Sequence, residues 1–389
     1  MEEKEFLNTY STPMYVFDAG VLKRRVEFLK NSLPENVSLC YAIKANTFIV
    51  KELDDIIDRF EVCSPGELSV CRKLNISGEK IIFSGVYKTP SVVEGLMEED
   101  YHMGIYSIES MVQYKLLIQM ANKYNRHITV MPRLTSGNQF GMTKDEVKTI
   151  IKEVMDMPNV SLAGIQFFSG TQKNSLKKLK RELTKLDEFI ELLKEELEYV
   201  PEELEFGPGF PVTYFEDEEF DEVEFLKGFS EIINEMSFKS KITLELGRSI
   251  AASCGSYYTS VVDMKSNKGQ NYAIVDGGMN HIVYFGQSMA MKHPRCEILP
   301  ARDTDGALDW NICGSLCTAN DILVKQLPIK DLQLSDVIKF ENTGAYCMIE
   351  GISLFLSRDL PYVFIKNEDG TYKSIRDALP TYPLNTPNY

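Results

Sequence analysis

Short apolar runs alternate with stretches of helical periodicity between residues 24 and 246. Such runs predict buried strands, and they occur at Val37–Ile43, Lys80–Phe83, Gly104–Tyr106, Ile128–Arg133, Leu162–Phe168, Leu204–Phe206 and Ile242–Leu246. The clearest helix is predicted at 176–197, where leucine and isoleucine side chains form one stripe opposite lysine and glutamate. An earlier helix is predicted after Asp18, whose side chain suits the N-cap position.

This alternation favours an α/β fold with a closed barrel. Roughly seven or eight strands separated by helices match a (β/α)8 barrel, which typically has about 250 residues. A doubly wound parallel sheet has the same alternation and stays open as an alternative on pattern alone.

After Arg248 the pattern changes to strands separated by turn signals. The predicted strands are Ser256–Met264, Gln270–Val275, Val337–Glu341 and Tyr362–Lys366. We therefore expect a barrel domain over residues 24–246 and a mainly β domain formed by residues 1–23 and 247–389. The acidic run 216–224 is predicted to be a solvated loop or a helix start.

Composition and charge narrow the class of protein. The chain has 389 residues, 44% of them hydrophobic and 25% charged, which is typical of a globular protein. Its formal net charge of −15 argues against non-specific binding to nucleic acid or to an anionic membrane. The polar, acidic start and the lack of an apolar run near ~18 residues predict a cytoplasmic protein. Eight scattered cysteines without a CxxC pair predict free thiols and no metal site.

Three motifs of the predicted barrel could carry chemistry. Lys44 follows the first barrel strand, and a lysine amine there can form a Schiff base with an aldehyde. Gly207 and Gly209 flank Pro208 in a turn after a strand, where backbone N–H groups can approach a phosphate. Glu245 and Arg248 end the last predicted strand with a carboxylate and a guanidinium. Taken singly, each motif also has an ordinary interpretation: a surface lysine, a turn and an ion pair.

The predicted β domain adds two stretches. Cys317 is followed four residues later by Asp321, and Tyr346 follows the pair Gly344-Ala345. Each has a structural alternative, because cysteine is often a small buried hydrophobic residue and tyrosine packs well.

Together and in this order, these motifs resemble the fold-type III pyridoxal-phosphate decarboxylases, the ornithine and diaminopimelate decarboxylase family. The resemblance extends from Thr12 to Tyr346. It implies an alanine-racemase-like fold, with a (β/α)8 barrel and a C-terminal β domain, and pyridoxal 5'-phosphate as cofactor. It also implies a carboxy-lyase that acts in amino-acid metabolism. The family's homodimers complete each active site with residues from the partner subunit.

The resemblance also implies roles for individual residues. Lys44 would form the Schiff base, and Glu245 would face the pyridine nitrogen. The phosphate would be held by a set of glycines and polar side chains: Gly207, Gly209, Thr171, Arg248 and Tyr346.

Further family positions lie around these. Cys317 would be the partner-subunit thiol that protonates the product. Glu61 and Glu67 match acids near the cofactor, and Arg133 matches an arginine that supports the site.

Departures from the family pattern bear on the substrate. Phe168 stands where the family has a histidine stacked on the cofactor ring. Thr318 replaces an acid that pairs with a distal substrate ammonium, and a hydroxyl cannot offset the desolvation of a buried ammonium. Tyr284 and Phe285 stand about where diaminopimelate enzymes have an arginine for a substrate carboxylate. Pro208 removes one N–H donor from the glycine turn.

These departures predict α-decarboxylation of an amino acid without a free distal ammonium, with Thr318 and Tyr284 as substrate-binding candidates. The stretch Gly137–Met142 and Cys317-Thr318 resemble decarboxylases of secondary biosynthesis, including one that acts on glutamyl groups on an acyl-carrier protein. A diaminopimelate or ornithine decarboxylase, an amino-acid racemase and a non-catalytic regulator are the alternatives. His281 and His293 are predicted to be packing or surface residues.

Overall fold

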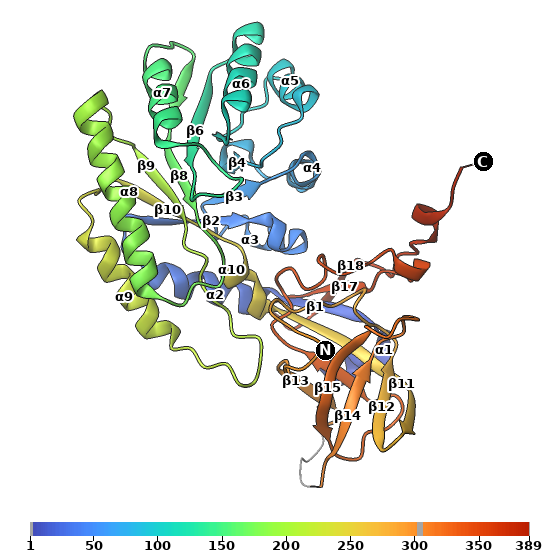
Figure 1. Cartoon of the computed structure of the whole chain (residues 1–389). Helices are drawn as coiled ribbons and strands as arrows, with labels where there is room; N and C mark the ends of the chain where they lie inside the picture. The colour runs from blue at the N-terminus through green and yellow to red at the C-terminus, as the bar shows by residue number, and fades with distance from the viewer. Residues whose placement is uncertain (1–2, 302–305, 389) are drawn as a thin grey trace. The chain divides into compact units, whose positions relative to one another are not determined.

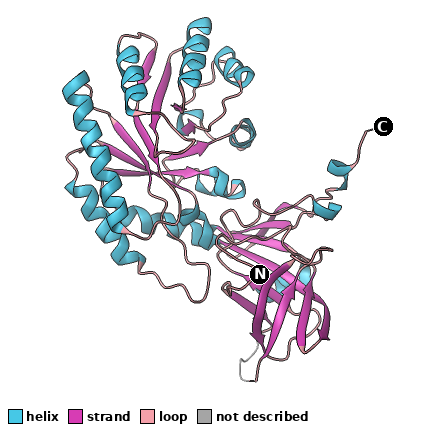
Figure 2. Cartoon of the chain, in the orientation of Figure 1, coloured by secondary structure: helices cyan, strands magenta, loops and turns pink. Residues whose placement is uncertain are grey.

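The computed structural model describes residues 3–301 and 306–388 and separates into two compact units (Figures 1 and 2). We call Arg25–Pro211 with Asp221–Ile250 the barrel unit, and Met1–Arg24, Val212–Phe220 and Ala251–Tyr389 the β unit. The predicted division had placed residues 212–220 in the barrel. They group with the β unit because Phe215 forms a β-bridge with Pro294 and the Glu216 N–H donates to the His293 carbonyl.

The barrel unit contains a closed ring of parallel strands (Figure 1). Among the described residues, eight strands pair in the order β2-β3-β4-β5-β6-β8-β9-β10, and β10 pairs with β2. Their bounds are Val37–Ala42, Arg59–Val62, Ile81–Phe83, Ile105–Ile108, Ile128–Leu134, Gly164–Phe168, Glu203–Gly207 and Lys241–Leu246. Closure confirms the barrel and excludes the doubly wound alternative.

Two details of the ring differ from the predicted strands. β3 (Arg59–Val62) was not predicted, because it has four residues and two of them are charged. The predicted strand Leu162–Phe168 is divided between β7 (Val160–Leu162), which pairs only with β6, and β8 (Gly164–Phe168).

The period-2 alternation of the strands separates polar from apolar side chains. Gln166 on β8 contacts Glu205 on β9 and Glu245 on β10, so these polar residues share one side of the sheet. Phe167 and Phe206, from the positions between them, stack on each other with ring centroids 6.3 Å apart. The barrel interior is therefore polar near these strands, while aromatic side chains pack outside it.

Four helices of the barrel unit, α4, α6, α7 and α9, begin at N-caps with a side-chain hydrogen bond. Ser64, Ser110 and Asp221 accept the N3 backbone N–H of α4, α6 and α9, and Thr143 forms a capping box with Glu146 at α7. The helices of four or more residues are α2 (Ala19–Asn31), α3 (Val50–Leu53), α4 (Pro65–Lys73), α5 (Pro90–Glu98), α6 (Met111–Tyr124), α7 (Lys144–Met155), α8 (Leu176–Leu197), α9 (Glu222–Glu235) and α10 (Arg248–Ala251). α8 confirms the predicted stripe, and Asp18 Oδ1 accepts the Val21 N–H at 2.9 Å, as the predicted cap requires.

The β unit is built on one sheet in the order β15-β14-β12-β11-β1-β17-β18, with β16 on β11 and β13 on β16. The predicted strands correspond to β11 (Gly255–Asn267), β12 (Gln270–Val275), β16 (Val337–Phe340) and β17 (Tyr362–Lys366). The sequence did not predict β1 (Met14–Asp18), β13 (Cys296–Leu299), β14 (Leu308–Cys313), β15 (Ile322–Ile329) or β18 (Tyr372–Arg376). α1 (Glu3–Thr9) precedes β1, and Phe6 of α1 stacks on Tyr372.

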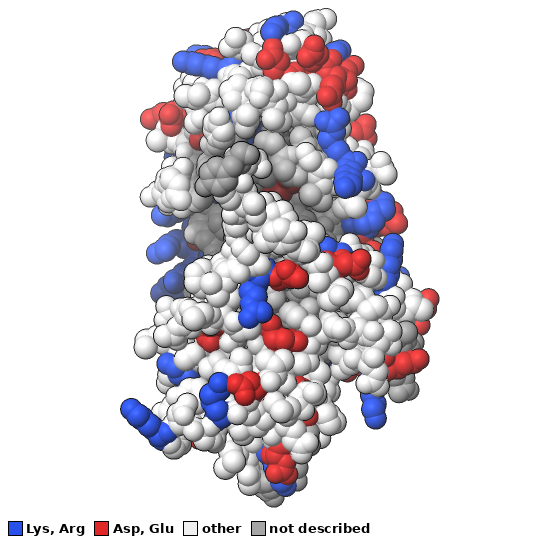
Figure 3. Space-filling model, turned by 90° about the vertical axis from the view of Figure 1, so that its right-hand side faces the viewer, with Lys and Arg blue, Asp and Glu red and all other residues white. Residues whose placement is uncertain are grey.

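The helices, the charged side chains on the surface and the cysteines of the described residues agree with what the composition predicts. Within residues 3–301 and 306–388, the helices all fall short of the length and apolar character needed to cross a membrane. Acidic and basic side chains are interspersed between uncharged areas on the face that Figure 3 presents. All eight cysteines lie in the described part of the chain as free thiols.

Candidate active site

Lys44 lies just beyond β2, in the 3-10 turn Ile43–Ala45. Its Nζ donates to Glu61 Oε2 at 2.7 Å and lies 3.3 Å from Glu245 Oε1. The Lys44 side chain is 40% exposed, whereas those of Glu61 and Glu245 are 2% and 6% exposed. A cationic amine is thus held by two buried carboxyls at the carboxyl-terminal end of the barrel strands, where barrel enzymes place their catalytic groups.

The two carboxyls have different affinities for a proton. Burial alone would raise the pKa of Glu61, but Lys44 and the Cys63 thiol hold it below its usual value. Burial and the charge of Glu61 raise the pKa of Glu245 to about 7. The pair therefore presents one firm negative charge beside Lys44 and one carboxyl that can carry a proton near neutral pH.

The glycine turn after β9 lies against a second loop. Gly209 has a φ of +61°, and a Cβ there would lie 2.1 Å from the Gly170 carbonyl oxygen. The Lys173 N–H donates to the Gly209 carbonyl at 2.8 Å. Only a residue without a side chain allows this approach. It brings exposed Thr171 beside the turn, while Arg248 begins α10 directly after β10.

Phe168 ends β8 at the same end of the barrel. A Cβ on Gly207 would lie 2.3 Å from the Phe168 ring, so the ring packs directly against the glycine backbone. Arg133 is a second neighbour of the Phe168 ring. Its guanidinium carbon lies 5.9 Å from the ring centroid, and the guanidinium pairs with Glu109 at 3.0 Å. Gly207, Arg133 and Glu109 therefore set the position of the aromatic ring.

Glu67, predicted to lie near the cofactor, has a local structural partner. Its Oε2 accepts the Cys63 N–H at 2.6 Å, and its own N–H donates to Ser64 at the N-cap of α4. Glu67 thus orders the turn that follows Glu61.

The residues predicted from the C-terminal half lie in the β unit. Cys317 is exposed and Thr318 half-buried, in the loop between β14 and β15. Asp321 orders this loop, since its carboxylate accepts the Leu316 N–H at 2.7 Å. Tyr346 has a φ of +65° after the Gly344-Ala345 turn.

Tyr284 and the two histidines have structural surroundings. The Tyr284 hydroxyl donates to the Glu341 carbonyl at 2.6 Å, and its ring packs against Tyr214 in the core of the β unit. The substrate contact predicted for Tyr284 stays a prediction. His281 is buried, and burial lowers its pKa to about 4, which agrees with a packing role. His293 is half-buried and its Nε2 lies 3.0 Å from the Lys325 carbonyl.

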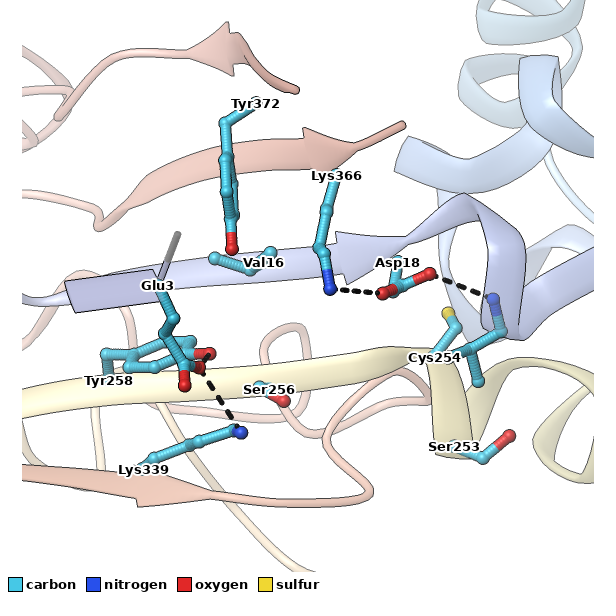
Figure 4. Close-up of a pocket in the computed structure, with 11 residues that line it drawn as sticks. Glu3, Val16, Asp18, Ser253, Cys254, Ser256, Tyr258, Lys339, Lys366 and Tyr372 are labelled. Carbon is cyan, nitrogen blue, oxygen red and sulfur yellow. Dashed lines mark hydrogen bonds and ion pairs between the residues drawn. The ribbon is translucent and has the colours of Figure 1, made fainter. Parts of the chain in front are cut away.

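A separate cavity of about 540 Å³ lies in the β unit (Figure 4). Its charged side chains pair with one another: Lys366 with Asp18 at 3.0 Å and Lys339 with Glu3 at 3.3 Å. The Tyr258 hydroxyl donates to Glu3 as well. The sequence-predicted site residues do not line this cavity, and its ion pairs leave no charge pattern that defines a ligand.

Sequence reasoning missed several polar residues around Lys44. Cys63 donates its thiol to Glu61 Oε1 at 2.9 Å, and Gln166 bridges Glu205 and Glu245. Lys88, buried after β4, donates to the Ser84 carbonyl, and burial lowers its pKa to about 8. Polar residues at alternate positions of otherwise apolar strands were the available signal for Gln166 and Glu205.

The donor set fits pyridoxal phosphate. The amine of Lys44 is accessible, the buried carboxyl of Glu245 suits a ring nitrogen, and the Gly207–Gly209 turn offers a backbone cradle that a Cβ would fill. Thr171 and Arg248 supply a hydroxyl and a guanidinium, the groups that bind phosphate oxygens.

Comparisons with known proteins agree with this chemistry. The L-glutamyl-[BtrI acyl-carrier protein] decarboxylase of Niallia circulans is 27% identical over 94% of this chain and 91% of that protein. The 2-[(L-alanin-3-ylcarbamoyl)methyl]-2-hydroxybutanedioate decarboxylase of Staphylococcus aureus is 28% identical over 88% of this chain and 91% of that protein. The crystal structure of a diaminopimelate decarboxylase from M. jannaschi shares the fold, with a TM-score of 0.86, 21% identity and coverage of 98% of this chain and 93% of that one.

A family model covers most of the barrel unit. Residues 19–252 match the model described as "Pyridoxal-dependent decarboxylase, pyridoxal binding domain". This match spans more than half of the chain and includes Lys44, Glu61, Gly209, Glu245 and Arg248. The chain therefore belongs to the pyridoxal-dependent decarboxylases, fold-type III enzymes that use pyridoxal phosphate to remove the carboxylate of an amino acid.

Proposed function

We propose that this decarboxylase acts on an α-amino acid whose distal group is neutral or masked, presented on an acyl-carrier protein. The observation that carries the chemistry is the Lys44 amine held between buried Glu61 and Glu245. The observation that carries the substrate class is Thr318, a hydroxyl at the position where the family's amine-specific members have an acid.

In this proposal each barrel residue has a stated task. Lys44 would hold the cofactor through its aldehyde group, with loss of water, and Glu245 would hold a proton at the ring nitrogen. Glu61 keeps the Lys44 amine in place until the cofactor binds. When bound, the cofactor supplies a conjugated ring that draws off the electrons of the breaking bond. Phe168 would cover the ring with an apolar face and exclude water from it.

The phosphate is assigned to the two loops that meet at Gly209. The Gly207–Gly209 turn offers its backbone, and Thr171 and Arg248 add a hydroxyl and a guanidinium. Pro208 has no N–H, so the turn holds the phosphate with fewer donors than a run of three glycines.

The names of two relatives support a masked distal group, whereas others, such as one from Aquifex aeolicus, are diaminopimelate decarboxylases. Of the two supporting names, one describes a glutamyl group on an acyl-carrier protein, and the other an alanyl group joined through a carbamoyl group. Neither name describes a free distal ammonium. Burying an ammonium beside Thr318 would leave a charge without a counter-charge, at a cost of several kcal/mol.

The substrate is tested by cofactor-dependent CO2 release. We expect turnover of a glutamyl thioester on a carrier protein, and little turnover of ornithine, lysine or diaminopimelate. Thr318→Asp should raise kcat/KM for a basic amino acid relative to wild type, with Thr318→Ser as the matched neutral control. Efficient turnover of ornithine, lysine or diaminopimelate by the wild-type enzyme would contradict the substrate class. Loss of optical activity without CO2 release would favour the racemase alternative.

A second copy of the chain is proposed to complete each site. Exposed Cys317 would then act from the partner subunit and protonate the product at its α-carbon. Mixing inactive Lys44→Ala chains with Cys317→Ala chains tests this arrangement. Random dimers should recover roughly a quarter of wild-type activity, because half are mixed and each mixed dimer has one intact site. If both residues served one site from the same chain, mixing would restore nothing.

A further inference from the structure

The barrel interior holds a chain of polar groups that the tasks above do not use. The Ser107 hydroxyl on β5 donates to Gln166 Oε1 at 2.6 Å. Gln166 Nε2 then donates to Glu205 Oε1 at 2.7 Å and to Glu245 Oε2 at 3.3 Å. All of these residues are at least nine-tenths buried. Side chains from four strands thus form one buried chain of hydrogen bonds that ends at Glu245.

Ser107 determines which way the Gln166 amide faces. Its hydroxyl donates to the amide oxygen, which leaves the two amide hydrogens for the two carboxyls. In the reverse orientation the amide oxygen would face the Glu245 carboxylate, and neither group could donate to the other. The Gln166 amide can therefore donate to an ionised Glu245 only in the orientation that Ser107 supports.

Among the buried carboxyls near Lys44, Glu205 is the one that has no cationic partner within the described residues. Lys44 contacts Glu61 and Glu245, whereas Glu205 forms no ion pair within the described residues. The second oxygen of Glu205, Oε2, is buried and has no hydrogen-bond partner in the described part of the chain. A buried carboxylate in this position would be strongly disfavoured, while a carboxylic acid carries no charge to compensate.

The titratable groups that face Glu205 raise its pKa, and the Gln166 hydrogen bond, which lowers it, is the smaller influence. Burial and the nearby carboxyls Glu245 on β10, Glu61 on β3 and Glu203 on β9 raise the pKa of Glu205 well above its usual value. The Cys40 thiol on β2 also faces it, and burial raises the pKa of that thiol, so it adds no charge at neutral pH.

We propose that Ser107, Gln166 and a neutral Glu205 are positioning residues, which hold Glu245 by its Oε2 and leave its Oε1 for Lys44 and the cofactor. This proposal rests on the cofactor-facing role of Glu245. A neutral Glu205 lets the Gln166 amide bind both carboxyls without adding a second negative charge beside Glu245. The negative charge of Glu245 is then available at Oε1, the oxygen that would face the ring nitrogen of the cofactor.

The first test measures the protonation state of Glu205 in the apoprotein. Above the unfolded pKa near 4.3, the unfolded Glu205 loses its proton while the native one keeps it. The unfolding constant of wild type should then rise with pH relative to that of Glu205→Gln, by up to about tenfold per pH unit. Urea unfolding of both proteins at several values between pH 5 and 8 gives this ratio. A ratio that stays flat or falls with pH overturns the proposal.

Glu203→Gln is the matched control on the same strand. Burial alone would raise the pKa of Glu203, but Arg59 and Lys241 hold it below its usual value. The ratio of wild-type to Glu203→Gln unfolding constants should therefore fall as the pH rises from about 3 to 5. Opposite pH trends at two glutamates on one strand separate the neutral acid from a general effect of substitution.

The second test measures the coupling of Gln166 to Glu245. Gln166→Leu should weaken pyridoxal phosphate binding by about tenfold, because a hydrogen bond to a charged group is lost, and less than twofold in a Glu245→Gln background. Ser107→Ala is the milder variant, and it should show the same background dependence if Gln166→Leu folds poorly. Absorbance titration of the full-length apoprotein measures the affinity. Equal effects in both backgrounds overturn the positioning role, whereas wild type that fails to bind the cofactor overturns the role of Glu245 as well.

Discussion

Two glutamates of strand β9, Glu203 at its start and Glu205 at its middle, lie in opposite electrostatic surroundings. Glu203, at the amino-terminal end, pairs with Arg59 at 2.5 Å and with Lys241 at 3.1 Å. These cations hold its pKa below the usual value even though burial alone would raise it. Glu205, two residues further on, meets the Gln166 amide and other carboxyls, and burial with their charges raises its pKa.

This difference shows that the two ends of the barrel use buried charge in different ways. At the amino-terminal end the buried charge of Glu203 has two partners of opposite sign, and this balance stabilises the fold. At the carboxyl-terminal end Glu61 and Glu245 share the single amine of Lys44, so negative charge is left for a ligand. A barrel whose active site lies at the carboxyl-terminal end of its strands is expected to show this asymmetry.

The largest expected effect removes the amine at the carboxyl-terminal end. Lys44→Ala should lower the rate of CO2 release by roughly three orders of magnitude or more, because the covalent bond to the cofactor is lost. Borohydride reduction of the wild-type holoenzyme and peptide mapping should label Lys44. The exposed Lys51→Ala is the control and should turn over normally. A label on another lysine would refute this assignment.

The amino-terminal end should respond in stability and not in turnover. Arg59→Met leaves Glu203 with Lys241 alone and should cost about 3 kcal/mol of unfolding free energy, as expected when one partner of a buried pair is removed. The rate at saturating cofactor should stay within about twofold of wild type, which corresponds to about 0.4 kcal/mol. Lys30→Met, which breaks the exposed pair with Asp58, is the control and should cost about 0.5 kcal/mol. If Arg59→Met also lost turnover, the claim that charges at the amino-terminal end serve stability alone would be contradicted.

Gly209→Ala should weaken cofactor binding at the carboxyl-terminal end. The new Cβ would lie 2.1 Å from the Gly170 carbonyl, in a backbone conformation that favours glycine. We expect about a tenfold higher dissociation constant for pyridoxal phosphate, because strain of this kind costs about 1–3 kcal/mol. Gly370→Ala has a similar φ of +80° in open space and should leave the affinity unchanged. Equal affinity in Gly209→Ala would remove this turn from the phosphate site.

Phe168→His should have the smallest effect. An imidazole can keep the contact with the Gly207 backbone, and an aromatic contact contributes about 0.5–1.5 kcal/mol. We therefore expect cofactor affinity within about tenfold of wild type, measured by absorbance titration, while Phe168→Ala should lose more. Identical affinities for all three proteins would mean that the ring does not contact the cofactor.

Local sequence patterns were sufficient for the motifs with a fixed spacing. Lys44 after a strand, the glycine turn at 207–209 and Glu245 with Arg248 all fall at the carboxyl-terminal end of the ring that the structure closes. The prediction failed for the short strand β3, where Arg59 and Glu61 hide the apolar signal. The Tyr284 hydroxyl donates to the Glu341 carbonyl, a contact that the sequence did not reveal, and the predicted substrate contact of Tyr284 stays a prediction.

The sequence alone determined the alternation of strands and helices in the barrel, because periodicity is a local property of the chain. The order of its motifs, through their resemblance to a known family, indicated the class of chemistry and the residue types that carry it. Closure of the barrel decided which polar side chains meet. Ser107, Gln166 and Glu205 are far apart in sequence, and their hydrogen bonds exist only because β5, β8 and β9 face one interior. Protonation followed from the same packing, since burial and neighbouring charge set a pKa, and both depend on contacts between distant segments.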